Sequence, residues 1–341
     1  MSHTFDNRDA RILYALDLDS RQSYLQLSKT LSMSQNAIRY RVEHLIREGI
    51  IKTFQTVVDI GKLGYISFRL YLRLKNATPQ QEEALLDWLK HQPIVAWIVS
   101  IEGRYDIGML VLTRDVAEMN AFWQQMIETH VNIIDDRLLT IMARVDYYSR
   151  AYLIGKEAND YEIAFITEPT TPDTDETDLR ILATIATDAR KAIIDIAREL
   201  DLSAKTVIAR IRSLEKRKII LGYRMMIDRQ KIGYEYVKIL IRLQNSTPAR
   251  RRELRNFIKW HPNIIYNDEV LGGEDVEIEL EVQDMAHLRT IIDDMRTRFA
   301  SIIADHDVMR FYKEHKYVYL PMDLCGQAQP VKGKARKEHS A

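Results

Sequence analysis

The sequence contains a single cysteine, Cys325, among its 341 residues. One cysteine excludes an intramolecular disulfide and any zinc site built from several cysteines. The sequence also lacks the run of about 18 apolar residues that a membrane-spanning helix needs. Its first residues lack the charged-then-apolar order of an export signal. We therefore expect a soluble, cytoplasmic protein with no membrane partner.

The sequence has no excess of either charge, because 49 basic residues balance 49 acidic ones. Net charge therefore identifies no partner, and any attraction to nucleic acid has to come from local basic clusters. The histidines show neither i,i+4 spacing nor spacing paired with cysteine, and no serine lies in a nucleophile-elbow motif. We predict no metal site, no cofactor and no catalytic nucleophile.

What the sequence does contain is an internal repeat. The segment Asp9 to Leu13 returns as Asp178 to Leu182, an offset of 169 residues (178 − 9). The offset holds without insertion or deletion to about Tyr148 in the first copy and Tyr317 in the second. A duplication without gaps indicates two copies of one fold.

The first third of each copy predicts three short helices, the last of them beginning after a serine. Ser34 in copy one and Ser203 in copy two can cap the third helix, because a serine hydroxyl accepts from free backbone amides. The apolar residues that follow Ser34 have helical spacing and predict one buried face: Ile38, Val42, Leu45 and Ile46.

Each third helix ends before a β-prone segment. Gly49 is suited to end the helix of copy one, whereas Lys218 stands at that position in copy two. The segments 50–58 and 219–227 follow directly and predict strands. Three helices joined to strands of this kind predict a winged helix-turn-helix in each copy.

The remainder of each copy alternates as strand, helix, strand, strand, helix, strand, which predicts a ferredoxin-like α+β domain. The fold class is therefore α+β, with two tandem copies of a winged helix-turn-helix followed by a βαββαβ domain. The predicted boundaries are 1–60 and 61–158 for copy one, 159–176 for a polar linker, 177–228 and 229–325 for copy two, and 326–341 for a disordered basic tail.

This order of domains resembles the Lrp/AsnC (feast/famine) family of prokaryotic transcriptional regulators, in a tandem-duplicated form. The residues that carry the resemblance are Asp9, Ile12, Leu13, Ser34, Ile38, Arg41, Val42, Leu45, Gly49, Ile50, Ile51, the segment 62–65, Gly103, Tyr105 and Asp106. The resemblance implies double-stranded DNA as a partner, bound by the helix after Ser34. It also implies a small-molecule effector, commonly an amino acid, bound at the sheet domains.

The side of the first recognition helix that faces away from the apolar stripe is polar. Arg39 can read a guanine edge, and Asn36 or Gln35 an adenine, because their donor and acceptor groups match those edges in the major groove. Tyr40 lies on the same side. Arg41 and Lys52 are predicted to contact phosphates, which position the helix without reading sequence. The competing interpretation is an ordinary solvated helix face.

Copy two departs from copy one on this surface. Ile208 replaces Arg39 and Ala209 replaces Tyr40. The remaining polar candidates are Ser203, Lys205, Thr206, Arg210 and Arg212, which suit phosphate attraction better than guanine readout. We therefore predict that the two halves read unequal half-sites, or that copy two adds mainly non-specific affinity.

The turn after the second strand of each sheet domain resembles the family's effector loop. In copy one, Gly103 lets backbone amides approach an anion, Arg104 can meet a carboxylate and Asp106 an amine, with Tyr105 between them. Copy two keeps only Gly272 and Asp275 and lacks the arginine and the tyrosine. The competing interpretation is a structural turn whose aspartate binds its own backbone.

Strand parity gives different open faces to the two sheets. In copy two, Glu277, Glu279 and Glu281 alternate with apolar residues, so the glutamates share the face away from the helices. Copy one has Gly108, Leu110 and Leu112 at those positions. Copy one is therefore the stronger candidate for association between chains. Alternatively, the two sheets pack on each other within one chain, and the glutamates meet Arg69 and Arg73.

Fold alone does not decide function, because sirohaem decarboxylases resemble the same architecture. Such an enzyme needs basic residues in the sheet-domain cleft to hold the porphyrin carboxylates, and the sequence shows no cluster of histidine and arginine there. We therefore predict a DNA-binding regulator that is not an enzyme. A ligand-sensing adaptor without DNA binding is a third interpretation.

Overall fold

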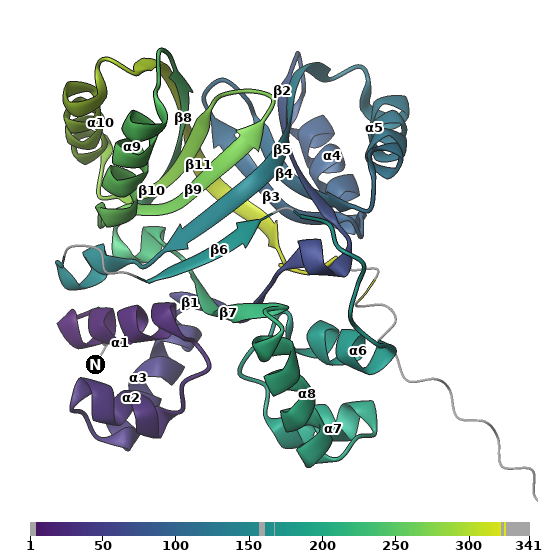
Figure 1. Cartoon of the computed structure of the whole chain (residues 1–341), viewed down its shortest axis with the longest axis vertical. Helices are drawn as coiled ribbons and strands as arrows, with labels where there is room; N and C mark the ends of the chain where they lie inside the picture. Colours follow the sequence, from purple (N-terminus) through teal and green to yellow (C-terminus); the bar gives the residue numbers. More distant parts are fainter. Residues whose placement is uncertain (1–4, 157–160, 167, 322–323, 325–341) are drawn as a thin grey trace, which may run out of the picture.

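A computed structural model describes residues 5–156, 161–166, 168–321 and 324. The predicted basic tail, 326–341, lies outside the described residues. Two helical units lie at one end of the molecule and two helix-covered sheets at the other (Figure 1). None of the described helices is long and apolar enough to cross a membrane.

Each copy begins with three helices, as the periodicity predicts. Copy one has α1 (Asn7–Leu18), α2 (Tyr24–Leu31) and α3 (Gln35–Arg47). Copy two has α6 (Glu176–Ile185), α7 (Ile193–Leu200) and α8 (Ala204–Lys216). Serine or aspartate side chains cap the N-termini of five of these six helices, while Ala192 precedes α7 without a side-chain cap.

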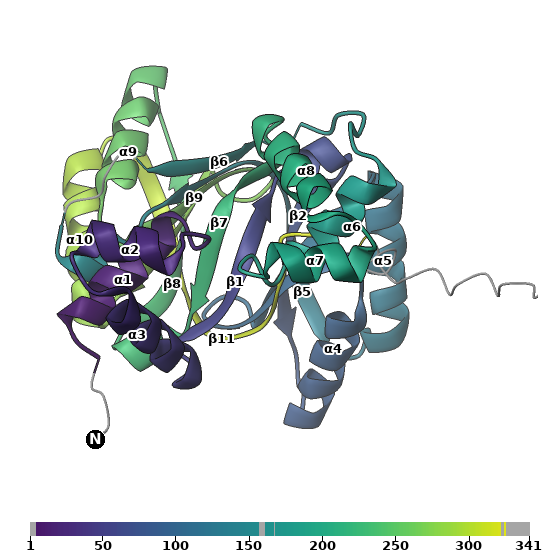
Figure 2. The same ribbon diagram turned by 90° about the horizontal axis from the view of Figure 1, so that it is seen from below.

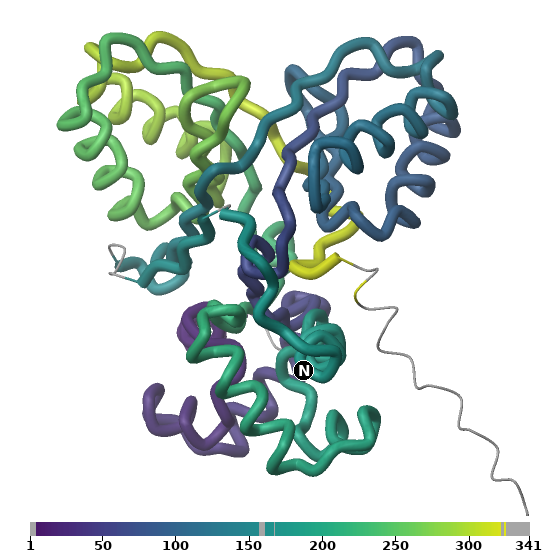
Figure 3. Tube along the Cα trace, turned by 45° about the vertical axis from the view of Figure 1, so that its right-hand side comes forward, coloured from purple at the N-terminus to yellow at the C-terminus, as the bar shows by residue number. Residues whose placement is uncertain are grey.

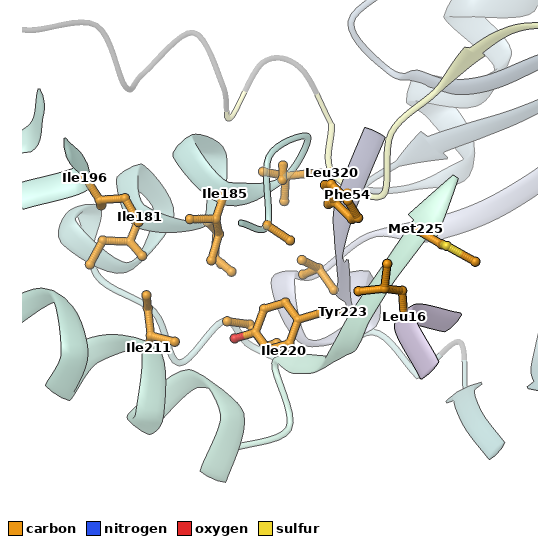
Figure 4. Packing of buried hydrophobic residues seen from close by; sticks show 14 of the residues in the cluster. Leu16, Phe54, Ile181, Ile185, Ile196, Ile211, Ile220, Tyr223, Met225 and Leu320 are labelled. Atoms are coloured by element: carbon orange, nitrogen blue, oxygen red, sulfur yellow. The ribbon is translucent and has the colours of Figure 1, made fainter. Parts of the chain in front are cut away.

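The strands after the helices pair with each other across the two copies. β1 (Ile51–Val58) and β7 (Ile220–Ile227) form a two-stranded antiparallel sheet. Their residues share one apolar core with both helical units and with Leu320 from the C-terminal segment (Figure 4). Because this core is common, the two helix-turn-helix units are held at a fixed spacing within one chain.

The sheet domains have the predicted element order. Copy one contains β2 (Ile66–Leu74), α4 (Pro79–His91), β3 (Val95–Glu102), β4 (Ile107–Thr113), α5 (Val116–His130) and β5 (Ile134–Tyr148). Copy two contains β8 (Glu235–Leu243), α9 (Pro248–Trp260), β9 (Ile264–Leu271), β10 (Val276–Val282), α10 (Met285–Phe299) and β11 (Ile303–Tyr317). Short 3-10 helices lead into the sheets and follow β5: η1 (Ile60–Leu63), η3 (Gln230–Ile232) and η2 (Ala151–Ile154).

The two sheets join at both edges into one closed ring of strands. β3 pairs with β11, and β9 pairs with β5, while β5 also pairs with β2. The strand order β2-β4-β3-β11-β8-β10-β9-β5 therefore returns to its start. Figure 3 shows the C-terminal strand, in yellow, passing from the lobe of copy two to that of copy one. The helices α4 and α5 cover copy one, and α9 and α10 cover copy two (Figure 1).

The predicted linker is partly structured. Residues Glu162–Ile166 form β6, which pairs with β5 and extends the sheet outside the ring. The prediction of an unstructured linker over 159–176 is therefore wrong for this segment. Its Glu-Ile-Ala-Phe-Ile sequence places apolar residues where a strand can bury some of them, and Ile163 is buried.

The inner face of the ring carries the predicted glutamates, and it is closed within the chain. Glu277, Glu279 and Glu281 are buried there, and Arg69 of copy one lies 3.2 Å from Asp268 and 3.6 Å from Glu279. The interpretation in which the two sheets pack on each other within one chain is therefore confirmed for Arg69. It is wrong for Arg73, which is exposed.

Lys238 lies at the centre of this inner network. Its ammonium group is 2.7 Å from Glu277, 2.9 Å from Asp268 and 3.1 Å from Glu279. Tyr71 donates to Glu277 at 3.0 Å. Two cations thus face three carboxylates away from water, an arrangement that is stable only because each ion is paired.

A second buried network joins the ring to the first helical unit. Arg150 donates to Asp17 of α1 at 2.5 Å and to Glu281 at 2.8 Å. Arg229 pairs with Glu281 and, at 2.6 Å, with Glu314. The side chains that fill this part of the ring are therefore charged and mutually paired.

These networks give a pH-dependent stability. Burial raises the pKa of Asp268 to about 6, against the attraction of Lys238 and Arg69. Burial also acts to raise the pKa of Glu281, but Arg150 and Arg229 lower it to about 2. Because the folded state binds a proton on Asp268 before the unfolded state does, that residue adds stability as the pH falls from about 6 to 4. Glu281 behaves oppositely, and its stabilisation is lost as the pH falls from about 4.5 to 2.

We therefore expect Asp268→Asn to remove a gain in unfolding free energy on the order of 2 kcal/mol between pH 7 and pH 4. Denaturant unfolding of the parent and the variant across this range measures the difference. Asp305→Asn, at an exposed aspartate, is the control. Parallel pH profiles for the parent and Asp268→Asn would contradict the shifted pKa.

The two recognition helices end differently. Gly49 follows α3 with φ +68°, and Lys218 occupies the corresponding position after α8 with φ +58°. A side chain is strained in this left-handed region, whereas glycine is not. We expect Lys218→Gly to raise the free energy of unfolding by about 0.5–1 kcal/mol and Gly49→Ala to lower it by at least that amount. Urea denaturation tests both variants, and destabilisation by Lys218→Gly would contradict this reading of the turn.

Candidate nucleic-acid interface and effector turns

The first recognition helix, α3, begins where the sequence predicts. The Ser34 hydroxyl accepts a hydrogen bond from the backbone amide of Ala37 at 3.2 Å. The predicted buried face is confirmed at Ile38, Val42 and Leu45. It is wrong at Ile46, which is 43% exposed.

The opposite side of α3 projects into solvent. Its exposed side chains are Gln35, Asn36, Arg39, Tyr40 and Glu43. The Arg39 guanidinium lies over the ring of Tyr24, 5.8 Å from its centroid. A side chain on this surface is free to enter a groove without any change in the core, as base reading requires.

Arg41 and Arg210 have intramolecular partners in place of the solvent exposure that a phosphate contact favours. Arg41 lies 3.0 Å from Asp6 and 2.8 Å from Asp9, and its side chain is 13% exposed. Arg210 repeats this contact with Asp175 at 2.6 Å and Asp178 at 3.3 Å. Each arginine therefore ties its recognition helix to the first helix of the same unit. Their predicted contact with phosphate stays a prediction that this pairing disfavours.

The second recognition helix, α8, has the same cap and a less polar outer face. The Ser203 hydroxyl accepts from the amide of Thr206 at 3.0 Å. Lys205 and Arg212 are exposed, and Ile208, at the position of Arg39, is 38% exposed. The structure thus places basic side chains on this face, with an apolar residue where copy one has its guanine-reading candidate.

Lys52 lies away from the recognition helices, at the junction with the ring. Its ammonium group is 3.7 Å from Asp228, and it lines a hollow together with Arg229 and Tyr312. A phosphate contact by Lys52 also stays a prediction that this placement disfavours.

The two helical units lie on the same side of the molecule. Seen from below, α1 to α3 and α6 to α8 lie on opposite sides of the β1–β7 sheet (Figure 2). The shared core and a cross-unit contact hold this arrangement, because Arg190 donates to the carbonyl groups of Ser20 at 2.6 Å and Gln22 at 2.9 Å. The geometry presents two helices in a fixed relation to one extended partner.

The predicted effector turns have structural contacts of their own. Asp106 accepts from the backbone amide of Leu74 at 2.7 Å, and Asp275 accepts from that of Leu243 at the same distance. These contacts match the interpretation of a turn whose aspartate binds backbone. Contact of either residue with an effector stays a prediction.

The other residues of the turn in copy one pack against copy two. Tyr105 is buried and stacks on Tyr71, with ring centroids 5.6 Å apart. Gly103 has φ +147°, and a Cβ there would lie 3.0 Å from the Val308 carbonyl oxygen of β11. Arg104 lies 3.0 Å from Asp307, and its side chain is 47% exposed. Arg104 is therefore the member of the turn that is most accessible to a ligand.

The turn in copy two is packed in the equivalent way. Gly272 has φ +81°, and a Cβ at the neighbouring Gly273 would lie 2.9 Å from the Thr140 side chain of β5. The glycines of both turns thus allow close approach to the last strand of the other copy. Sequence reasoning gave them an anion-binding role, because the cross-copy pairing was not visible to it.

A tandem pair of winged helix-turn-helix units, each followed by a ferredoxin-like sheet domain, is the class of protein that this architecture defines. The model of a winged helix-turn-helix DNA-binding domain matches twice, at residues 5–52 and 174–220. An HTH-type transcriptional regulator of Pyrococcus abyssi is 32% identical over 117 residues, which cover 34% of this chain and 73% of that protein. The regulatory protein AsnC of Haemophilus influenzae is 30% identical over 135 residues, covering 39% and 86%. The chain belongs to the Lrp/AsnC family.

The likeness to solved structures extends over both copies. The crystal structure of the siroheme decarboxylase NirDL covers 94% of this chain and 96% of its own, with a TM-score of 0.62 and 12% sequence identity. At that identity the likeness shows the fold alone. It confirms the predicted α+β arrangement along the whole chain.

Proposed function

We propose that the protein is a sequence-specific, DNA-binding transcriptional regulator whose two helix-turn-helix units engage one duplex. The observation that carries the proposal is the exposed outer face of α3, with Arg39, Asn36 and Gln35 in solvent on a helix that Ser34 caps. The membership of the family and the two matches to a DNA-binding domain support it. A small-molecule effector at the sheet domains is part of the proposal, and Arg104 is its accessible candidate contact.

The two units are proposed to contribute unequally. Copy one offers hydrogen-bonding groups that match base edges, whereas copy two offers Lys205 and Arg212 beside the apolar Ile208. Basic side chains of this kind neutralise phosphates and add affinity without reading sequence. We expect a binding site in which one half carries most of the sequence information.

Selection of genomic DNA fragments with the purified chain tests the proposal. We expect an enriched motif with one strong and one weak half, and an affinity that falls steeply with salt. Repeating the selection with candidate amino acids tests for an effector. Absence of binding at low ionic strength would contradict the regulator and favour the adaptor.

An enzyme on this fold is the second candidate, because the NirDL likeness spans both copies. A substrate with several carboxylates needs an excess of cations in its site. The described inner face of the ring instead has three carboxylates, Asp268, Glu277 and Glu279, against Arg69 and Lys238. Titration with an iron uroporphyrin, followed by visible absorption, separates the candidates, since tight stoichiometric binding would favour the enzyme.

A further inference from the structure

The ring of strands contains a pocket in one half of the molecule. It encloses about 760 Å³ not filled by atoms, part of it open to solvent. This size falls within the roughly 300–1,000 Å³ of small-molecule sites. Its walls are largely aromatic and aliphatic, and they include Trp97, Leu110, Leu112, Met142, Tyr266 and Tyr319.

The corresponding position in the other half is filled. At the offset of 169 residues, Leu112 corresponds to Glu281, Ile60 to Arg229 and Val145 to Glu314. Arg150 stands in the same relation to Tyr319. These charged residues form the second buried network, in which Arg150 and Arg229 both pair with Glu281. The duplication has therefore kept an apolar pocket in one half and replaced its counterpart with ion pairs.

One polar group in the pocket wall needs a partner. Arg69 lines the pocket and is 6% exposed, and its Nε has no hydrogen-bond partner among the described residues. Its other nitrogens face Asp268 and Glu279, and its guanidinium lies 4.7 Å from the centroid of Trp97. A buried donor without an acceptor costs roughly 1–3 kcal/mol, so an occupant that accepts from Arg69 would recover part of this.

The charges beside Arg69 select the kind of acceptor. Asp268, Glu277 and Glu279 already exceed Arg69 and Lys238 by one negative charge. An added carboxylate would enlarge this excess in a site of low polarity. Glu279 is already engaged by Lys238 and Tyr236, so a ligand ammonium is not needed there. An uncharged acceptor, such as a carbonyl oxygen, meets the requirement of Arg69 without unbalancing the charges.

We propose that this pocket binds one uncharged, largely apolar small molecule per chain, with a single hydrogen-bond acceptor directed at Arg69. The inference does not rest on DNA binding. The pocket also touches residues 58–61, the connection between β1 and the sheet domain of copy one. An occupant therefore contacts the segment that joins the helical units to the ring.

Calorimetric titration of the full chain without DNA tests the proposal, with acetophenone as the probe. We expect one site per chain. We expect ethylbenzene, which lacks the acceptor, to bind roughly tenfold more weakly. Benzoate and L-phenylalanine should also bind more weakly, because each brings a carboxylate. Two equal sites, or tighter binding of benzoate or L-phenylalanine, would overturn the proposal, and so would no detectable binding of acetophenone.

Two variants place the probe in this pocket. Leu110→Trp fills the half-buried wall and is expected to abolish binding. Leu139→Trp makes the same change at a residue that is 41% exposed and outside the pocket wall, and it should leave binding unchanged. Circular dichroism and thermal unfolding establish that both variants are folded. Unchanged binding by a folded Leu110→Trp chain would overturn the assignment, whatever the DNA experiments give.

Discussion

Replacement of Lys238 by methionine is expected to lower the free energy of unfolding by about 3–5 kcal/mol, because it leaves buried carboxylates without their central cation. Lys238 is 0% exposed and lies within 3.1 Å of Asp268, Glu277 and Glu279. Methionine has a similar length and fills the space, so lost packing contributes little to the effect. Chemical denaturation followed by circular dichroism measures the loss.

Two further variants separate the charge effect from the substitution itself. Lys75→Met removes a lysine whose side chain is 49% exposed and 4.0 Å from Asp135, and it should cost less than about 1 kcal/mol. Adding Glu277→Gln to Lys238→Met should recover part of the lost stability, because it removes one uncompensated negative charge. A Lys238→Met chain as stable as the parent would show that the carboxylates take up protons or water without cost.

The sequence predicted the parts of the fold that depend on local periodicity. The glutamates of β10 were assigned to one face because side chains in a strand alternate, and the structure buries all three there. The outward residues of α3 were assigned by helical periodicity, which fixes which side of a helix is apolar. The gapless repeat predicted that each such feature has a counterpart 169 residues away, as the paired contacts of Arg41 and Arg210 illustrate.

What the sequence did not predict depends on contacts between distant segments. The pairing of β3 with β11, and of β5 with β9, closes the ring, and no local pattern specifies that register. Sequence reasoning therefore left open whether the sheets pack within or between chains. The same gap explains Arg41, whose partners Asp6 and Asp9 lie on a different helix, and Gly103, whose close neighbour is β11. β6 was missed because its short strand pattern adjoins a stretch rich in proline, threonine and aspartate.

Closure of the ring within one chain has a consequence for divergence after duplication. In a symmetric dimer of single-copy subunits, a substitution appears on both sides of the interface. Here the two sides can change independently. Leu112 and Glu281 occupy equivalent positions, yet one lines a pocket and the other binds two arginines. Arg39 and Ile208 differ in the same way on the recognition helices.

This divergence predicts distinct effects for basic residues in the two copies. Arg39→Ala is expected to weaken binding to the preferred site by about 1–3 kcal/mol, with little change on unrelated duplexes. Lys216→Ala, which removes an exposed lysine at the end of α8, is expected to weaken binding evenly on all sequences. It should also reduce the slope of log affinity against log salt by about one. Fluorescence anisotropy on matched and scrambled duplexes, at several salt concentrations, measures both effects.

The position equivalent to Arg39 supplies the matched variants. Ile208→Ala should leave sequence preference unchanged, because an apolar side chain offers no donor to a base edge. Ile208→Arg places in copy two the guanidinium that copy one presents, and it should strengthen preference in the weaker half of the site where a guanine is in reach. If Arg39→Ala instead lowers affinity by the same factor on every sequence, Arg39 is a phosphate contact. In that case sequence discrimination lies with Asn36 and Gln35, the remaining groups of α3 whose donors and acceptors match base edges.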